Sequence, residues 1–298
     1  MQTLYQLIYN PFLNYILRNL NKVFEFLFKS KLKIPPSGII TLKTDSGHLK
    51  MATNQTSYLT QLLFWNGYKK FEYSELFEQL SKRTSVFLDI GSNIGYYSLL
   101  AAKSNPQIKV FAFEPAMGPK HYLKENIHLN NFQSQIKALD VALSNTIGTI
   151  DFFEVKSLKY KNLSHNLAGE GNAGTKTKTR NFVKNRVEAT TLSAFVQSEN
   201  LNQIDLIKID TEGTEIDILN SGKEFIEKFQ PIAICETLFN TIENELEVFF
   251  KELDYEFYNH TSKGLTKVQT IKRTDDDGIR NCFFVPKSKV ELISEFII

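Results

Sequence analysis

The sequence has few of the features that mark secreted or nucleic-acid-binding proteins. Its 298 residues include only two cysteines, Cys235 and Cys282, in apolar, strand-like surroundings where buried thiols are expected rather than a disulfide or a metal site. This cysteine usage favours a reducing, cytoplasmic compartment. The formal net charge is +2, from 35 basic and 33 acidic residues, so no positive field predicts nucleic acid as a partner.

The sequence also lacks an apolar run long enough for a confident transmembrane helix. Residues 1–17 carry no charge but are interrupted by glutamine, asparagine and proline. No basic stretch precedes them and no small-residue cleavage site follows, which disfavours a signal peptide. We expect the helical stripe in this region to pack on the domain or on another subunit of a homo-oligomer. The alternative is that residues 1–33 lie on the inner surface of an anionic membrane. The stripe comprises Leu13, Ile16, Leu17, Leu20, Val23, Phe24, Leu27 and Phe28.

Prolines at 35 and 36, followed by Ser37 and Gly38, break this helix and divide the chain. We predict an N-terminal helical extension with its linker over residues 1–38. A hairpin with a helical lead-in is predicted over 39–85, and one α/β domain over 86–298. Turn residues at 45–47 indicate the hairpin, and helical spacing between 58 and 80 indicates the lead-in.

The stretch from Val86 to Gly95 is the main motif of the sequence. An apolar run, typical of a strand covered on both faces, ends in an acid, and a loop with two glycines leads into a helix. Glycines there would let a cofactor lie against the turn. Dinucleotide-binding proteins have a glycine where the acid stands, and a carboxylate suits the ammonium and sulfonium groups of S-adenosylmethionine better than a pyrophosphate. The predicted cofactor-binding residues are Asp89, Gly91, Ser92, Asn93 and Gly95.

The next two predicted strands supply further cofactor residues. Glu114 lies at the end of the strand predicted over 109–115 and is placed to accept hydrogen bonds from both ribose hydroxyls, because ligands of doubly wound sheets lie across the carboxyl ends of the strands. Residues 136–143 are predicted as the third strand. The residues expected to border the adenine ring lie near its end: Asp140, Val141 and Ala142.

A polar insertion then interrupts the domain. Residues 148–153 are predicted to form an added strand, hairpinned with the third, and a stretch rich in Lys, Asn, Gly and Thr follows over 156–184. Such long stretches inside compact domains are either functional lids or disordered. His165 lies in this loop and is a candidate base near neutral pH, although a solvated loop histidine is the simpler interpretation.

A second group of acids follows two later apolar runs. Asp210 and Glu212 end the run that begins at Leu206, and Glu236 ends the run that begins at Pro231. Methyl transfer to oxygen needs a hydroxyl that is held in line with the methyl group and loses its proton. Asp210 and Glu212 are therefore predicted catalytic residues, and Glu236 a predicted substrate residue. The same three carboxylates are the candidates for holding a divalent cation. The alternative is that Asp210 and Glu212 only cap the next helix or anchor its loop.

Five segments, in their order along the chain, resemble the FkbM family of S-adenosylmethionine-dependent methyltransferases. The resemblance covers about residues 72–236 and implies a class I methyltransferase fold: an α/β, Rossmann-like doubly wound sheet of seven mostly parallel strands, the last antiparallel. Residues 255–258 and 281–286 are expected to supply the last two strands. The resemblance also implies S-adenosyl-L-methionine as cofactor and O-methylation of a hydroxyl on a sugar, a surface glycan or a related metabolite. The segments are Asp89–Gly95, Phe113–Pro115, Asp140–Ser144, Ile207–Gly213 and Ile234–Glu236.

Two other interpretations stay open. A Rossmann-type NAD(P)-dependent oxidoreductase or epimerase would also use Glu114, but Asp89 in place of a glycine argues against it. A non-catalytic cofactor-binding scaffold is compatible with the glycine loop, but the acids at 210, 212 and 236 argue for an enzyme. Nucleic-acid methylation is disfavoured further because the Asn/Asp-Pro-Pro-Tyr/Phe motif of amino-group methylases is absent.

Overall fold

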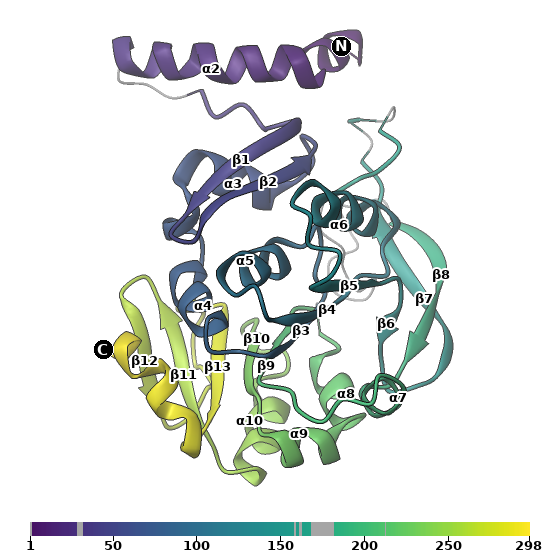
Figure 1. Ribbon diagram of the computed structural model, residues 1–298, viewed down its shortest axis with the longest axis vertical. Coiled ribbons are helices and arrows are strands. Elements are labelled where there is room, and N and C mark those ends of the chain that lie inside the picture. Colours follow the sequence, from purple (N-terminus) through teal and green to yellow (C-terminus); the bar gives the residue numbers. More distant parts are fainter. Residues whose placement is uncertain (1, 29–31, 158, 161–162, 168–181, 212) are drawn as a thin grey trace.

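The protein is built around an eight-stranded sheet in the order β12-β11-β13-β10-β9-β3-β4-β5 (Figure 1). The computed structural model describes residues 2–28, 32–157, 159–160, 163–167, 182–211 and 213–298, with the backbone alone over 22–28. The strands from β10 to β5 run parallel, whereas β13 is antiparallel to both β10 and β11. The strands are β3 (Val86–Ile90), β4 (Lys109–Phe113), β5 (Ile136–Leu139), β9 (Leu206–Ile209), β10 (Ile232–Glu236), β11 (Tyr255–Thr261), β12 (Gly264–Val268) and β13 (Asn281–Pro286).

This arrangement confirms the predicted doubly wound α/β fold, including the antiparallel last strand. The two strands expected near 255–258 and 281–286 are present as β11 and β13. The main sheet has eight strands where seven were expected, because the chain turns back after β11 and adds β12 to the edge, with Thr261 opposite Gly264.

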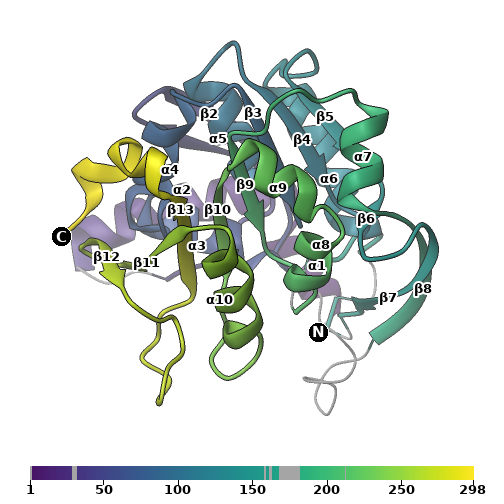
Figure 2. The same ribbon diagram turned by 90° about the horizontal axis from the view of Figure 1, so that it is seen from below.

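Helices cover both faces of the sheet because its strands are apolar on both sides. Along β3, Phe87 belongs to one core cluster, whereas Leu88 and Ile90 belong to the other. The Phe87 face is covered by α4 (Ser74–Ser81), α5 (Tyr96–Ser104), α6 (Met117–Leu129) and the 3₁₀ segment η2 (Lys287–Phe296). The other face is covered by α7 (Leu192–Ser198), α8 (Glu215–Asn220), α9 (Lys223–Phe229) and α10 (Glu243–Glu252) (Figure 2).

The region before β3 adds to the Phe87 face. Strands β1 (Gly38–Thr44) and β2 (Gly47–Thr53) form the predicted hairpin, and α3 (Tyr58–Asn66) and the short 3₁₀ turn η1 (Tyr68–Lys70) precede α4. Leu49 of this hairpin belongs to the same core cluster as Phe87. The hairpin therefore shares a hydrophobic core with the main sheet, and the boundaries at residues 38 and 85 stay predictions.

A separate three-stranded sheet, β6-β8-β7, contains the segments that flank the polar insertion. The prediction of one strand over 136–143 is wrong: β5 ends at Leu139, and β6 (Ala142–Leu143) pairs with β8 (Phe182–Thr190). The predicted hairpin of residues 148–153 with the third strand is also wrong, because β7 (Gly148–Val155) pairs with β8.

The end of the polar insertion is also misplaced in the prediction, since β8 already begins at Phe182 rather than after residue 184. The cause is the composition of β8. Its charged side chains at Lys184, Arg186 and Glu188 are all exposed and alternate along the strand. A strand with such an exposed, charged face has the polarity of a loop when only its sequence is read.

The N-terminal helices α1 (Gln2–Ile8) and α2 (Pro11–Phe28) lie across one end of the molecule, above the hairpin in Figure 1. Three residues of the apolar stripe of α2 are exposed and do not pack on the domain, and packing of the stripe on another subunit stays a prediction. No helix in the part of the chain that the structure describes is long and apolar enough to cross a membrane. The exposed residues are Leu13, Ile16 and Leu20.

Candidate functional site

A cavity of about 240 Å³ lies where the parallel strands β3, β4 and β9 end. The loops after these strands form one side, and the segment around β6, together with β7, forms the other. The structure thus brings together residues that are far apart in the sequence, at the edge of the sheet where doubly wound folds bind ligands. Five predicted site residues line this cavity: Gly91, Glu114, Val141, Ala142 and Asp210.

The glycine loop is shaped by close backbone contacts. Gly91 has a φ of +74°, and a Cβ atom there would lie 2.0 Å from the carbonyl oxygen of Asp210. Gly95 has a φ of +87°, and a Cβ atom there would lie 2.5 Å from Leu123 Cδ1. A side chain at either position would therefore push neighbouring elements apart. The loop after β9 lies close to Gly91, and α6 lies close to Gly95. These contacts explain the two glycines, in addition to the predicted approach of a ligand.

Ser92, Asn93 and Glu114 join this loop to the end of β4. The Ser92 amide donates to the carbonyl oxygen of Phe113 over 3.0 Å. The Asn93 amide donates to Glu114 Oε2 over 2.8 Å, and the Ala116 amide donates to Glu114 Oε1 over 2.9 Å. Burial raises the pKa of Glu114 to about 7. Each carboxylate oxygen has a second acceptor site, so Glu114 can still accept hydroxyl groups from a ligand in the cavity.

Asp89 lies beneath the cavity rather than on its wall. Its Oδ2 accepts hydrogen bonds from the amide and the hydroxyl of Ser98, in the first turn of α5, over 3.1 and 2.5 Å. The carboxylate therefore caps α5. Its Oδ1 is buried, has no hydrogen-bond partner and lies 3.9 Å from the ammonium group of Lys208. Direct contact of Asp89 with a cofactor stays a prediction.

Lys208 is the main residue that the sequence analysis missed. It is buried in β9, and its Nζ lies 3.2 Å from Asp210 Oδ2. Burial lowers the pKa of Lys208, but the carboxylates of Asp210 and Asp89 outweigh this effect, so its pKa is raised and the ammonium stays charged. A lysine inside a four-residue strand that is covered on both faces was the available signal, because a buried charge needs a partner.

Asp210 stands between this buried lysine and the cavity. Its side chain is 45% exposed, so one part faces the cavity while Oδ2 pairs with Lys208. Glu212 lies outside the described residues. Glu215, in the first turn of α8, anchors this loop, which was the alternative role considered for Glu212. Its Oε1 accepts the backbone amides of Thr211 and Gly213 over 2.9 and 3.2 Å.

Two predicted residues point elsewhere. The Asp140 carboxylate pairs with Lys124 of α6 over 2.6 Å, and only its neighbours Val141 and Ala142 reach the cavity. The His165 ring stacks on His121 of α6, with ring centres 4.0 Å apart, and is not among the residues that line the cavity. Burial lowers the pKa of His165, which keeps the ring neutral. The structure does not bring either side chain to Asp210.

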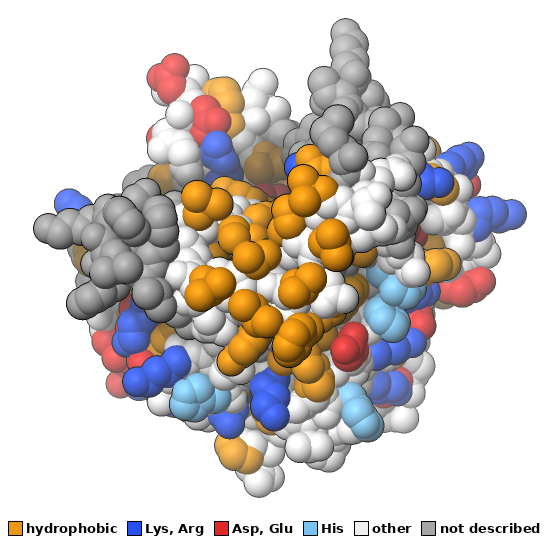
Figure 3. Space-filling view, turned by 90° about the horizontal axis from the view of Figure 1, so that it is seen from above, with side chains coloured by type: hydrophobic (Ala, Val, Ile, Leu, Met, Phe, Trp, Pro, Cys, Tyr) orange, Lys and Arg blue, Asp and Glu red, His pale blue; other side chains and the backbone are white. Residues whose placement is uncertain are grey.

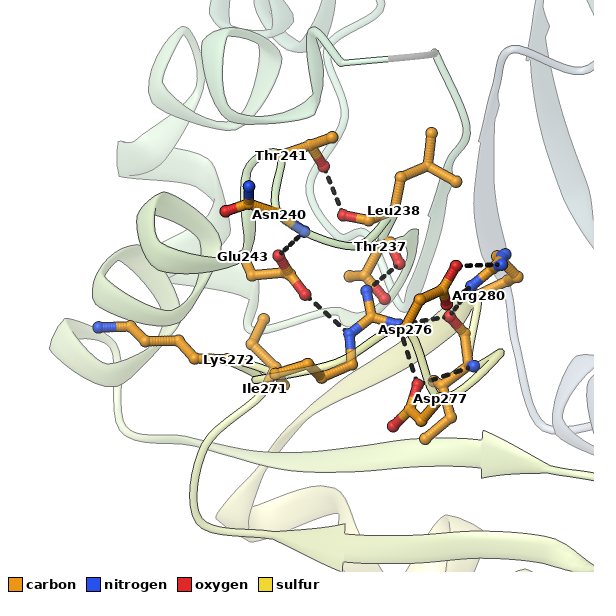
Figure 4. A network of polar contacts seen from close by, with 12 residues as sticks. Thr237, Leu238, Asn240, Thr241, Glu243, Ile271, Lys272, Asp276, Asp277 and Arg280 are labelled. Atoms are coloured by element: carbon orange, nitrogen blue, oxygen red, sulfur yellow. Dashed lines mark hydrogen bonds and ion pairs between the residues drawn. The ribbon is translucent and has the colours of Figure 1, made fainter.

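Glu236 ends β10, beside a separate polar network around Arg273 (Figure 4). The Arg273 guanidinium is buried and donates to Glu243 Oε1 and to the carbonyl oxygens of Thr237 and Ile279 over 2.7, 2.7 and 2.6 Å. These bonds fix the loop after β10 against the loop before β13. Glu236 is held at this junction and is not among the residues that line the cavity.

Of the carboxylates proposed for a metal, Asp210 lines the cavity, whereas Glu236 does not. Within the ranges that the structure describes, no group of three or more His, Cys, Asp or Glu side chains is arranged to hold a metal ion. Metal binding by Asp210, Glu212 and Glu236 stays a prediction, and Glu212 is outside these ranges.

The cavity fits an adenosyl group better than a dinucleotide phosphate. Four acidic residues line it, Glu114 and Asp210 among them, and the apolar residues of its wall include Val141 and Phe153. Carboxylates bind hydroxyl and cationic groups and repel phosphates, and apolar walls suit a flat ring. Asp89 Oδ1, which has no hydrogen-bond partner, is a further buried acceptor near the loop.

Comparison with known proteins agrees with this geometry. The family model described as "Methyltransferase FkbM domain" matches residues 89–257, more than half of the chain. Methyltransferase sdnD of Sordaria araneosa is 31% identical over 155 residues, which cover 46% of this chain and 60% of that protein. The 2-O-methyltransferase NoeI of Sinorhizobium fredii is 26% identical over 172 residues, which cover 52% of this chain and 65% of that protein. The chain thus spans less than two thirds of each relative.

Among solved structures, the methyltransferase FkbM of Methylobacillus flagellatus is similar, with 14% sequence identity and a TM-score of 0.41. The similarity covers 77% of this chain and 54% of that chain.

Proposed function

The chain belongs to the FkbM methyltransferase family, and we propose that it is an enzyme that transfers a methyl group from S-adenosyl-L-methionine to a hydroxyl group of a sugar or glycan. The observation that carries the proposal is the position of Asp210. Its half-exposed carboxylate faces the same cavity as Glu114 and is backed by Lys208 at 3.2 Å. One end of the cavity therefore suits the ribose of the cofactor, and the other suits an acceptor hydroxyl.

The cofactor, when bound, supplies an electrophilic methyl group on a positively charged sulfur. Glu114 would accept hydrogen bonds from the ribose hydroxyls, and Val141 and Ala142 would border the adenine ring. Asp210 would orient the acceptor hydroxyl and take its proton. Lys208 is a positioning residue, because its ammonium pairs with the Asp210 carboxylate and fixes its orientation.

A second, larger cavity supports a carbohydrate acceptor. It measures about 760 Å³ and lies between α1, the hairpin and α6. Tyrosine rings and amide side chains line it, which suits a ligand with apolar faces and many hydroxyl groups. Tyr122 of α6 lies in its wall, and its hydroxyl accepts a hydrogen bond from Asn54 over 3.3 Å. The lining residues include Tyr5, Tyr9, Tyr15, Tyr160, Gln6 and Gln55.

We infer that the two cavities serve one extended acceptor. Glu114 and Pro115 line the smaller cavity just before α6 begins at Met117, and Tyr122 lies five residues into that helix. At about 1.5 Å per residue, this is a rise of roughly 8 Å along α6. A glycan held in the larger cavity could thus present a hydroxyl near Asp210. The name of NoeI, a 2-O-methyltransferase, agrees with a hydroxyl acceptor.

The first experiment is calorimetric titration of the full chain with S-adenosylmethionine, S-adenosylhomocysteine and NAD. We expect the first two to bind and NAD not to bind. Binding of NAD alone would overturn the proposal. Release of S-adenosylhomocysteine is then measured with a panel of monosaccharides and oligosaccharides.

The Asp210→Asn variant tests the catalytic role. We expect it to keep its affinity for S-adenosylmethionine and to lose roughly 10²-fold or more in turnover, the usual effect of removing a general base. Asp140→Asn is the matched control, because this carboxylate also follows a strand of the sheet but pairs with Lys124. Equal turnover of the two variants would exclude Asp210 as the base.

A further inference from the structure

Helix α2 presents its polar side to the protein and its apolar side to solvent. The buried polar residues Asn14, Arg18 and Asn21 recur at the spacing of one helix face. Their relative exposures are 0%, 3% and 6%. Soluble proteins normally turn the opposite face inward, because burial of apolar surface stabilises the fold.

Specific hydrogen bonds hold the helix in this orientation. The Asn14 amide group donates to the carbonyl oxygens of Ile8 and Pro35, each over 3.2 Å, and Asn14 Oδ1 accepts the amide of Ser37 over 2.9 Å. The Arg18 guanidinium lies over the Phe64 ring of α3, 4.8 Å from its centre. Buried polar groups with partners of this kind fix one orientation, so the outward apolar face is a built feature of the fold.

The outer face consists of Leu4, Leu7, Phe12, Leu13, Ile16 and Leu20, with Phe12 70% exposed and Leu20 59% exposed. Figure 3 shows hydrophobic side chains gathered on that side of the molecule. Within the described residues, nine of the fifteen exposed large hydrophobic side chains lie between positions 4 and 39. The exposed apolar side chains are therefore concentrated on these two helices, whereas the other exposed apolar residues are isolated from one another.

The charges around this face favour a negatively charged partner. Residues 2–21 contain no acid, and their only charged side chain, Arg18, is buried. Lys33 is exposed beyond α2, and the Lys159 ammonium lies over the Tyr5 ring of α1, 4.9 Å from its centre. The sequence between positions 21 and 33 adds lysines at 22, 29 and 31 against one glutamate at 25. Figure 3 shows Lys and Arg side chains at the margin of the apolar area.

We propose that the outer face of α1 and α2 binds the surface of an anionic lipid membrane. Apolar side chains on two helices that lie flat across one end of the molecule can enter the headgroup region together. The flanking lysines add attraction to anionic lipids, which weakens as salt screens the charges. This proposal does not depend on methyl transfer, because it rests on the N-terminal helices alone.

Co-sedimentation of the full chain with vesicles tests this proposal. Vesicles of phosphatidylcholine with 30 mol% phosphatidylglycerol, about a third anionic lipid, should bind it and lose binding several-fold in 0.5 M salt. The Leu7→Glu/Leu20→Glu variant should bind roughly 100-fold more weakly, since two leucine side chains no longer enter the lipid. The control Ile147→Glu/Val248→Glu removes two exposed apolar residues far from α1 and α2 in the sequence and should bind like the wild type.

Unchanged affinity of both variants for S-adenosylhomocysteine, or equal thermal unfolding if that ligand does not bind, shows that they are folded. Equal vesicle binding by wild type and the α1–α2 variant would overturn the proposal. It would also be overturned if light scattering shows a dimer that only the α1–α2 variant disrupts, while vesicles bind neither protein. The face would then be an interface between two copies of the chain.

Discussion

The Glu114 carboxylate accepts a hydrogen bond from the backbone amide of Asn93 over 2.8 Å, which links the loops after two adjacent strands. Its other oxygen accepts the amide of Ala116 over 2.9 Å. Burial raises the pKa of this carboxyl group to about 7, although the two amides oppose the rise. Glu114 therefore titrates near neutral pH in a cavity where only the ionised form is a full acceptor.

Cofactor affinity is expected to depend on this titration. Since ribose hydroxyls bind the ionised carboxylate, affinity for S-adenosylmethionine should be full above pH 7 and fall by about tenfold between pH 8 and pH 6. Calorimetric titration at three pH values measures this. Glu114→Gln should bind more weakly throughout and lose most of the pH dependence. An unchanged slope in that variant would assign the dependence to another group.

Replacement of Lys208 by methionine should destabilise the fold. The change leaves the buried Asp89 carboxylate and Asp210 without their cation, and loss of one partner from a buried ion pair costs about 3 kcal/mol. Burial already raises the pKa of Asp89, and Lys208 opposes the rise, so the variant holds a proton on Asp89 up to a higher pH. The loss in free energy of unfolding, measured in urea, should therefore be smaller at pH 5 than at pH 8.

A double variant separates the ion pair from packing. Asp89→Asn in the Lys208→Met background removes the uncompensated charge and should recover part of the lost stability at pH 8. If the second substitution adds its own full loss instead, the charge interaction between Asp89 and Lys208 is not what stabilises this part of the core.

Gly91→Ala should lower the free energy of unfolding far more than Gly67→Ala, the same substitution at another glycine with a positive φ. Gly67 also has a positive φ, +82°, but no atom lies within 4 Å of a Cβ built there, whereas at Gly91 the Asp210 carbonyl oxygen is 2.0 Å away. Gly67→Ala should lose about 1 kcal/mol from backbone strain alone. Gly91→Ala should lose at least twice as much and weaken cofactor binding. Equal losses in urea unfolding would show that the β9 loop can move aside.

Arg273 and Arg280, which is labelled in Figure 4, are a matched pair for a test of the loop after β10. Arg273 is buried with 7% of its side chain exposed, whereas Arg280 is 44% exposed and pairs with Asp276. Arg273→Met should lower the free energy of unfolding by about 3 kcal/mol, because Glu243 and two carbonyl groups lose their donor. Arg280→Met should cost less than about 1 kcal/mol. Similar losses would contradict a role of Arg273 in fixing this loop.

Much of the fold could be predicted from local patterns. The predominantly apolar runs at 86–90, 109–113, 206–209 and 232–236 are the buried parallel strands, because a strand covered on both faces is apolar on both sides. The acids and glycines that follow them mark the carboxyl edge of the sheet. The meeting of Glu114 with the glycine loop followed from the same rule.

The errors lie where the sequence is only half apolar. Strand β8 carries exposed charges and was taken for a loop, and β5 was extended across the point where the chain leaves the main sheet near Asp140. Pairing between strands that are distant in sequence depends on the chain path, and a strand with one polar face carries a weak signal.

By itself, the sequence determined the fold class, the family and the glycine loop with its acids, since these depend on residue type and spacing along the chain. Only the tertiary structure decided that Asp89 caps α5, that Lys208 supports Asp210, that His165 packs on His121, and that α2 turns its polar side inward. Each of these depends on where a side chain points once distant segments have packed. The free energy of that choice comes from burial, hydrogen bonds and charge pairing across the fold.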